Sequence, residues 1–309
     1  PEAYPLTSAD RSADATSPPT RSSLNLMLDK RFIVVSGKGG VGKSAVAAAI
    51  AKSAARAGRN TLALSMVGNG MGLGAHLGMT ALEFKAQQIE PNLHALSIDR
   101  SKALVEYIQI QVGLPSYATF TPAVRAFDVL ASTAPAIREI VTMGKVLWEV
   151  KTGQWDLVVA DGPPTGQIGS FLGAATTMAN LVSTGRVADQ SKWMREIQID
   201  PAATELVLVS VPEELPTSET VETLEWLDGH PVVASRSIFA NRVMPRLETE
   251  AAGSGLAAEA ASLHRSLTAE QAIWLERLPT HLDLPFLFGA ESATVVSDRL
   301  AEAMGGLVS

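Results

Sequence analysis

Cysteine is absent from this chain of 309 residues. Without thiols there is no disulfide framework, no thiolate metal site and no cysteine nucleophile. The five histidines show no ligand spacing, so we expect no zinc-type site. A chain without cysteine needs no oxidising compartment, and we predict a cytoplasmic protein.

Long apolar runs and an excess of positive charge are also missing. No stretch reaches ~18 consecutive apolar residues, so we predict no stable membrane insertion. The first residues, PEAYPLTSADRSADATSPPTRSS, contain no apolar central segment, which argues against a secretory signal. Acidic residues outnumber basic ones by 32 to 25, which argues against a nucleic-acid partner.

The remaining composition is that of a globular protein, with 46% apolar and 18% charged residues. Residues 1–25 are rich in Ser, Thr, Pro and Ala, and we interpret them as a flexible leader. Residues 26–309 are predicted to form a single domain.

Strand-like and helix-like segments alternate along this domain. The expected strands are 30–37, 60–65, 92–99, 155–161, 203–214 and 232–243, with a loop or strand at 283–289. The expected helices are 43–58, 102–113, 135–153, 169–198, 216–229, 255–278 and 293–304. Such alternation predicts an α/β fold with a doubly wound, mostly parallel sheet. Helical stretches at about 101–150 and 169–198 are interpreted as an inserted helical subdomain.

One motif directs the search for function. The segment VVSGKGGVGKS, residues 34–44, satisfies G-x-x-x-x-G-K-[ST] between a strand and a helix. The glycines let backbone N–H groups approach phosphate oxygens, and the helix presents its positive end. A turn that binds nothing is the alternative, but a chance match is on the order of one in a hundred. The predicted nucleotide-binding residues are Gly37, Lys38, Gly39, Gly40, Val41, Gly42, Lys43, Ser44 and Ala45.

Three of these side chains have specific predicted roles. Lys43 would reach the β- and γ-phosphates, and Ser44 would ligate Mg²⁺. The early Lys38 resembles the extra lysine of the deviant Walker A loop in MinD/ParA and arsenite-pump ATPases. That resemblance implies a face-to-face dimer in which Lys38 reaches the partner's nucleotide, so that Lys38 and Lys43 are both catalytic. The alternative for Lys38 is a solvent-facing lysine.

Further segments narrow the resemblance. Residues 158–172, VVADGPPTGQIGSFL, resemble switch II of the arsenite-pump and tail-anchored-protein-targeting ATPases. There Asp161 would hold Mg²⁺, whereas a turn acid is the alternative. FANRVMP resembles a strand whose Asn, here Asn241, contacts adenine, although a turn Asn is also conceivable. DLPFLFG resembles a late loop that packs on the base near Pro285.

The resemblance spans about residues 31–304 and matches the actinobacterial anion-transporting ATPase type, which occurs as paired unequal subunits. It implies a P-loop NTPase fold of the SIMIBI class with ATP or ADP and Mg²⁺ as cofactors. It also implies a homodimer or, as we favour, a heterodimer with a homologous ATPase subunit.

Departures from the family pattern are informative. Switch I of the family reads close to D-P-A-H-S-L, and its Asp positions the attacking water. Here Met66, Val67 and Gly68 stand where Thr, Asp and Pro belong, and no carboxylate occurs between Asn60 and Ala81. Because a general base contributes about 10²–10⁴-fold, we predict a weakly hydrolysing or non-hydrolysing subunit.

The missing cysteines are a second departure, because arsenite pumps bind metalloid through thiolates and targeting ATPases use a Cys pair for zinc. We therefore expect neither arsenite transport nor a metal other than Mg²⁺. The targeting ATPases bind apolar clients on their helical subdomain. Large apolar residues that could serve such a client here, or pack in the core, are Met143, Leu147, Trp148, Met178, Leu181, Val182, Trp193 and Met194.

Three alternatives stay open at this level. The chain is an active ATPase whose missing acid is supplied elsewhere or in trans, driving targeting or chaperoning of an apolar client. It is a nucleotide-locked adaptor that carries such a client. Or it is a partitioning ATPase of the MinD/ParA type, against which the acidic balance and the lack of a basic amphipathic terminal helix count.

Overall fold

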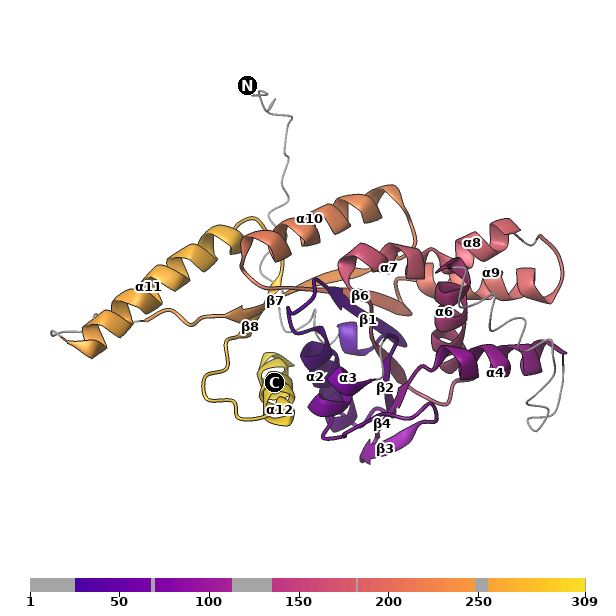
Figure 1. Ribbon diagram of the computed structural model, residues 1–309, viewed down its shortest axis with the longest axis horizontal. Helices are drawn as coiled ribbons and strands as arrows, with labels where there is room; N and C mark the ends of the chain where they lie inside the picture. The colour runs from indigo at the N-terminus through magenta and orange to yellow at the C-terminus, as the bar shows by residue number, and fades with distance from the viewer. Residues whose placement is uncertain (1–25, 68–69, 113–134, 182, 248–254, 309) are drawn as a thin grey trace, which may run out of the picture.

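An eight-stranded sheet with the order β3-β4-β2-β5-β1-β6-β7-β8 forms the centre of the molecule (Figure 1). The structure is a computed structural model that describes residues 26–67, 70–112, 135–181, 183–247 and 255–308. The strands are β1 (Phe32–Gly37), β2 (Thr61–Ser65), β3 (Gln87–Glu90), β4 (Leu93–Ser97), β5 (Leu157–Asp161), β6 (Thr204–Ser210), β7 (Arg236–Val243) and β8 (Leu282–Pro285). All neighbours pair in parallel except β3, which is antiparallel to β4. The predicted mostly parallel α/β fold is confirmed.

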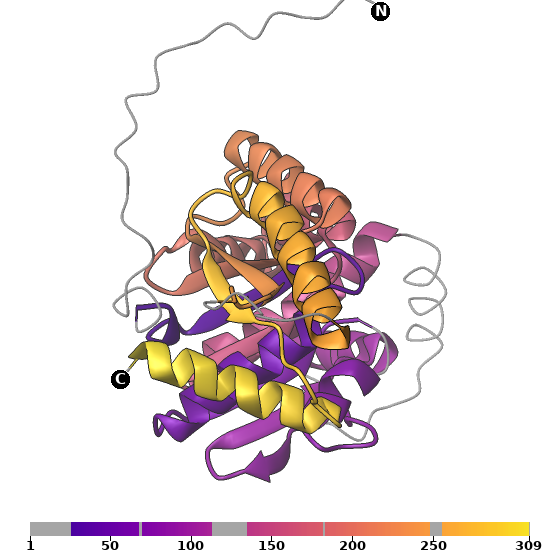
Figure 2. The same ribbon diagram turned by 90° about the vertical axis from the view of Figure 1, so that its left-hand side faces the viewer.

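Helices cover both faces of this sheet. In the described residues they are α2 (Lys43–Arg56), α3 (Met71–His76), α4 (Arg100–Val112), α6 (Pro135–Thr152), α7 (Thr165–Leu172), α8 (Ala174–Leu181), α9 (Arg186–Ile199), α10 (Glu214–Gly229), α11 (Leu256–Leu275) and α12 (Ala293–Val308). Helices α2, α3 and α12 share one apolar cluster with the sheet, whereas α4 and α6 to α10 contribute to the cluster on the opposite face. Figure 2 shows α12 alongside α2.

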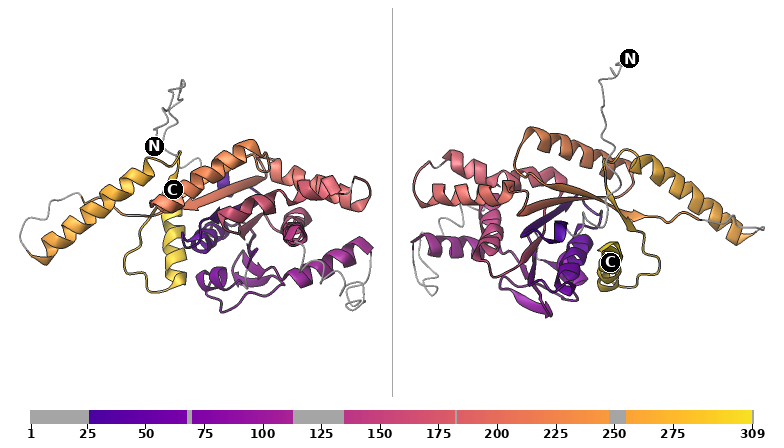
Figure 3. Two further views of the ribbon diagram at one scale, coloured as in Figure 1. Left: turned by 45° about the horizontal axis from the view of Figure 1, so that its top comes forward. Right: turned by 180° about the vertical axis from the view of Figure 1, so that it is seen from behind.

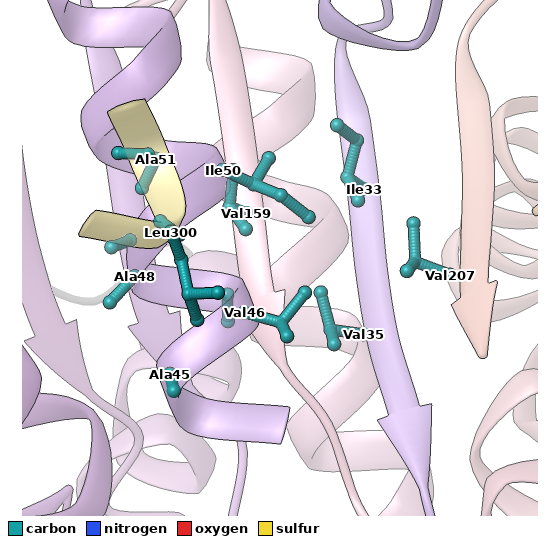
Figure 4. Close-up of a cluster of buried hydrophobic side chains, with 14 of the residues drawn as sticks. Ile33, Val35, Ala45, Val46, Ala48, Ile50, Ala51, Val159, Val207 and Leu300 are labelled. Carbon is teal, nitrogen blue, oxygen red and sulfur yellow. The ribbon is translucent and has the colours of Figure 1, made fainter. Parts of the chain in front are cut away.

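The central strand β1 is buried on both faces, as expected for a parallel strand between helical layers. Ile33 and Val35 belong to the cluster with α2, whereas Phe32 and Val34 belong to the opposite cluster. Figure 4 shows Val46 and Ile50 of α2 beside the strands, with Leu300 of α12 on the same side. Alanines along α2, including Ala48 and Ala51, are fully buried. Their small side chains let the helix approach both the sheet and α12.

Local structure differs from expectation in four places. Helix α3 and strand β3 were not predicted, and α7 begins at Thr165, where a loop was expected. The predicted helix 169–198 is divided into α7, α8 and α9, with breaks at Gly173 and Gly185. Gly185 is the N-cap of α9 and has a φ of 85°, a backbone conformation that residues with a side chain disfavour.

Helices α4, α6, α8 and α9 pack against one another at one end of the sheet. The predicted subdomain limits of about 101–150 and 169–198 stay a prediction, because part of the first range, 113–134, lies outside the described residues. The predicted leader, 1–25, lies outside them too. Within the part of the chain that the structure describes, no helix has the length and apolar character needed to cross a membrane.

Candidate functional site

The glycine-rich loop joins β1 to α2 at the carboxyl end of the central strand. Gly37 has a φ of 151°, and a Cβ there would lie 2.1 Å from the carbonyl oxygen of Val209. Gly42 has a φ of 97°, and a Cβ there would lie 2.5 Å from Nδ2 of Asn241. Both positions therefore require glycine, for backbone conformation and for space. The loop is fixed by its neighbours on β6 and β7 rather than by its own sequence alone.

Lys43 turns back over this loop at the start of α2. Its Nζ donates a hydrogen bond to the backbone oxygen of Lys38 at 3.0 Å. Burial lowers the pKa of Lys43, while the negative charge of Asp161 acts in the opposite direction. The ammonium group is thus held inside the loop, where the N-terminus of α2 and the loop amides could hold an anion.

Ser44 and Asp161 meet directly, although 117 positions separate them in the sequence. The Ser44 hydroxyl donates to Oδ2 of Asp161 at 2.6 Å, and Asp161 is the last residue of β5. Burial raises the pKa of Asp161, whereas the Ser44 hydrogen bond and the charge of Lys43 lower it. A hydroxyl and a carboxylate are the hard oxygen ligands that suit Mg²⁺. In the described residues no group of three or more His, Asp or Glu is placed to hold a metal by itself.

The segment after β5 lies against the end of β1. The Ser36 hydroxyl donates to the backbone oxygen of Pro163 at 2.7 Å. The backbone N–H of Gly162 donates to the Val35 oxygen at 2.9 Å, and a Cβ at Gly162 would lie 2.7 Å from that oxygen. The predicted switch II segment is thereby fixed beside the loop.

Glu219 of α10 connects this segment to the early lysine. Lys38 forms an ion pair with Oε1 of Glu219, and the Thr165 hydroxyl donates to Oε2 at 3.1 Å. The hydrogen bond from Lys38 is the main cause of the lowered pKa of Glu219. Sequence reasoning did not single out Glu219 or Thr165. The signal available for Thr165 was its place in DGPPTG, within the segment that resembles switch II, whereas Glu219 lies in an expected helix for which no role was predicted.

Apolar residues occupy the position of the missing switch I acid. Met66 is fully buried, and its N–H donates to the Asp161 backbone oxygen at 3.0 Å. Val67 is half-buried and packs on the apolar cluster between the sheet and helices α4 and α6 to α10. A Cβ at Gly72, in α3, would lie 3.1 Å from the Ser44 hydroxyl oxygen. The segment therefore lies beside Ser44 and brings no carboxylate to it.

The predicted base-contacting residues lie on the other side of the loop. Asn241 is buried in β7, and its Nδ2 donates to the Val41 backbone oxygen at 2.8 Å. Pro285 ends β8 and pairs with Val243 of β7. Pro285 also lines a cavity of about 360 Å³ that includes residues 243–246. The structure thus joins Asn241 directly to the glycine-rich loop, whereas Pro285 lies one strand further along the sheet.

Four of the eight apolar residues considered for client binding pack inside the protein. Met143, Leu147 and Met194 are fully buried, and Met178 is nearly so. Trp148 and Trp193 line a cavity of about 360 Å³ between α4, α6 and α9. Val182 and the side chain of Leu181 lie outside the described residues. Core packing accounts for these four buried residues.

Comparison with known proteins identifies the same family that the sequence resembles. Residues 30–186 match the family model described as anion-transporting ATPase. The chain is 30% identical over 226 residues to the ATPase BagA of Mycobacterium tuberculosis, covering 70% of this chain and 66% of that relative's length. It is 25% identical to a putative arsenical pump-driving ATPase of Halobacterium salinarum, over 84% of this chain and 41% of that protein. It is 24% identical to the ATPase get3 of Pyrenophora tritici-repentis, over 75% and 81% of the two chains.

The matched range contains the glycine-rich loop, Ser44, Asp161 and the apolar segment at Met66 and Val67. These are the residues that the fold gathers at the carboxyl ends of β1, β2 and β5. By sequence match, fold and site arrangement alike, the chain belongs to the anion-transporting ATPase family.

Proposed function

We propose that this chain binds ATP with Mg²⁺ at the loop between β1 and α2 and hydrolyses it slowly or not at all by itself. The observation that supports both halves is the contrast around Ser44. Asp161 and Lys43 lie beside Ser44, whereas the segment at Met66 and Val67, whose Met66 N–H donates to Asp161, brings no carboxylate.

The residues present fit this ligand. Amides of the loop and the Lys43 ammonium would bind the phosphates, and Ser44 and Asp161 would hold the ion, in place of their present hydrogen bond. Bound Mg²⁺ would supply neutralisation of phosphate charge. Asn241 and Pro285 would contact the adenine at the ends of β7 and β8, where open sheets of this kind bind ligands.

Hydrolysis additionally needs a group that orients water for in-line attack. Met66 and Val67 carry no hydrogen-bonding side chain, and Val67 packs into the apolar cluster. Loss of a general base alone removes about 10²–10⁴-fold in rate. Binding does not depend on that group, so affinity and turnover are separated in this chain.

We further propose that the chain works as a dimer, preferably with a homologous ATPase subunit that retains its switch I acid. Lys38 would then leave Glu219 and contact the partner's nucleotide, so that nucleotide state sets dimer geometry. The lack of cysteine supports a cytoplasmic setting, and the acidic balance opposes nucleic-acid binding.

Binding is tested by measuring thermal unfolding and calorimetric affinity with ATP, with and without Mg²⁺. Lys43→Ala should abolish the stabilisation by ATP, because the phosphates lose their ammonium partner. Lys192→Ala removes an exposed lysine on α9 and should behave as wild type. Equal binding of ATP by both variants would contradict the proposal.

Targeting or chaperoning of an apolar client is the second candidate function. The cavity lined by Trp148 and Trp193, together with Tyr107, favours it. An apolar peptide added in the presence of ATP should then quench or shift tryptophan fluorescence, and Trp148→Ala should remove most of that change. No fluorescence change with wild type would rule out this cavity as the client site.

A further inference from the structure

We propose that Gln271 of α11 is a positioning residue for the nucleobase, because its side chain holds the irregular end of β7 that follows Asn241, residues 242–244, here called the turn. The proposal rests on the proposed nucleotide binding and deepens it. It concerns the base half of the nucleotide, whereas the loop between β1 and α2 concerns the phosphates.

The contacts of Gln271 are bidentate and directed at backbone. Its Oε1 accepts a hydrogen bond from the Met244 N–H at 2.9 Å, and its Nε2 donates to the Arg242 oxygen at 3.0 Å. Both functional groups of one amide are thus used on one turn. An amide side chain of this length is the group that can satisfy a donor and an acceptor two residues apart.

The turn that Gln271 holds has an unusual conformation. Arg242 has a φ of 60°, and among the described residues only Asn92 shares a positive φ without being glycine. Residues with a Cβ rarely adopt this region and need support from their surroundings. Gln271 supplies that support by bonding to the oxygen of Arg242 itself and to the N–H of Met244.

The position of the turn indicates what this support is for. Asn241, one residue earlier, donates to Val41 of the phosphate loop. Residues 243–246, one to four positions later, line the cavity of about 360 Å³ together with Gln271 and Pro285. The Phe286 N–H also donates to the Val243 oxygen at 2.8 Å, which joins the ends of β7 and β8 beside this cavity. One short segment therefore connects the phosphate loop to the cavity at the carboxyl ends of β7 and β8.

A purely structural role for Gln271 is the weaker explanation. Helix α11 extends away from the sheet (Figure 3), and none of its residues is buried. Gln271 itself is only half-buried. Removing its side chain should therefore leave the core and the sheet intact while freeing the turn.

The test compares a ligand that has a base with one that has none. Binding of ATP and of inorganic tripolyphosphate, each with Mg²⁺, is measured by competition against a fluorescent ATP analogue. Gln271→Ala should weaken ATP binding about tenfold, because the freed backbone would have to be ordered when the base binds, at a cost of about one residue's conformational entropy, and should leave tripolyphosphate binding unchanged. Gln271→Glu keeps the acceptor for Met244 and should weaken ATP binding by less. Glu270→Ala, an exposed neighbour on α11, is the matched control.

Unchanged ATP affinity in Gln271→Ala would overturn the proposal. Equal weakening of both ligands would also overturn it, since that result indicates a general effect on the site. Melting temperatures of the variants establish that they are folded. Failure of the wild-type chain to bind ATP would instead refute the proposed function, so the two failures are distinguishable.

Discussion

At the scale of single residues, Asp161 is a buried carboxyl group that lowers the folding stability of the ligand-free protein when it is ionised. The carboxyl group is buried at the end of β5, and burial is the main cause of its raised pKa. A raised pKa means that the folded protein binds the proton more tightly than the unfolded chain. The carboxyl therefore opposes folding increasingly as the pH rises above its ordinary value of 3.8. A bound cation would remove this penalty.

Asp161→Asn should therefore raise the melting temperature of the nucleotide-free protein at neutral pH, because a neutral amide replaces a buried charge. The same variant should lose the Mg²⁺ dependence of ATP binding, because one of its two proposed ligands is gone. Differential scanning calorimetry, with and without Mg²⁺ and ATP, measures both effects. A less stable variant that still responds to Mg²⁺ would contradict the proposed role of Asp161.

The residues of the glycine-rich loop could be predicted from sequence because their chemistry is local and their spacing is fixed. Asp161 could be predicted only through the resemblance of its segment. Glu219 and Gln271 could not be predicted, because each acts across a distance in the chain, 181 positions from Lys38 and 29 from Arg242. No periodicity encodes such pairings. They follow from the order of strands in the sheet.

Val67→Asp should place a carboxylate where the family carries its switch I acid. Because the neighbouring residue Met66 already contacts Asp161 through its N–H, we expect the new side chain to lie near Ser44. Phosphate release should rise by about 10²-fold, the lower end of the contribution of a general base. Val67→Asn, equal in shape, is the control and should have no such effect. Equal rates for both variants would argue against the missing acid as the cause of slow turnover.

At the scale of elements, the helix that replaces switch I is tied to the C-terminal helix. His76 at the end of α3 has its Nδ1 2.7 Å from the Ala293 oxygen, and the Ser297 hydroxyl donates to the His76 oxygen at 2.7 Å. Lys52 of α2, fully buried, donates to Ser297 at 3.0 Å. Helices α2, α3 and α12 thus form one connected layer on the same face of the sheet.

Helix α3 could not be predicted because its six residues include two glycines and its pattern is too short to show a period. Its packing on α2 and α12 stabilises it instead. The strands β1, β2, β5 and β6 could be predicted because runs of apolar residues, many of them β-branched, are typical of strands covered on both sides. Helix-rich region 169–198 was predicted as helical, but its breaks depend on two glycines whose effect is decided by packing.

Two histidines should make the folding stability of the protein depend on pH in opposite directions. Burial is the main cause that lowers the pKa of His76 below 6.5, so its contribution is intact above 6.5 and falls as the pH decreases below it. The hydrogen bond to Asp283 is the main cause that raises the pKa of His281, so its stabilisation is present below 6.5 and is lost as the pH rises through the raised value.

Both directions of pH dependence are tested by measuring melting temperatures across this pH range for wild type, His76→Gln and His281→Gln. The loss of stability at low pH should be smaller in His76→Gln than in wild type. His281→Gln should be destabilised relative to wild type chiefly at the acidic end. Parallel curves for all three proteins would contradict both assignments.

At the scale of the whole molecule, the early lysine of the glycine-rich loop, Lys38, forms an ion pair within its own chain. Lys38 pairs with Glu219 on α10 and not with a phosphate group. Contact across a dimer would require this ion pair to open. Opening the ion pair should cost little free energy, because ion pairs between partly exposed side chains contribute little to stability. Nucleotide binding and association are therefore expected to be linked.

Mg²⁺ and ATP should shift the protein towards a dimer, or towards a complex with a homologous subunit. Lys38→Ala should keep ATP binding but reduce that association, because Lys43 and the loop remain in place. Glu219→Gln should favour association by freeing Lys38. Light scattering after gel filtration measures the masses. A wild-type chain that remains monomeric with nucleotide and with the homologous subunit would contradict the dimer.

The central claim is that the phosphate site is complete for binding but lacks the group that orients water. Its most direct test is release of inorganic phosphate from ATP by the purified chain alone, with bound nucleotide measured in the same sample. Our account predicts stoichiometric, Mg²⁺-dependent binding of ATP, with phosphate release no faster than that of Lys43→Ala. Rapid release by wild type that disappears in Lys43→Ala would contradict it.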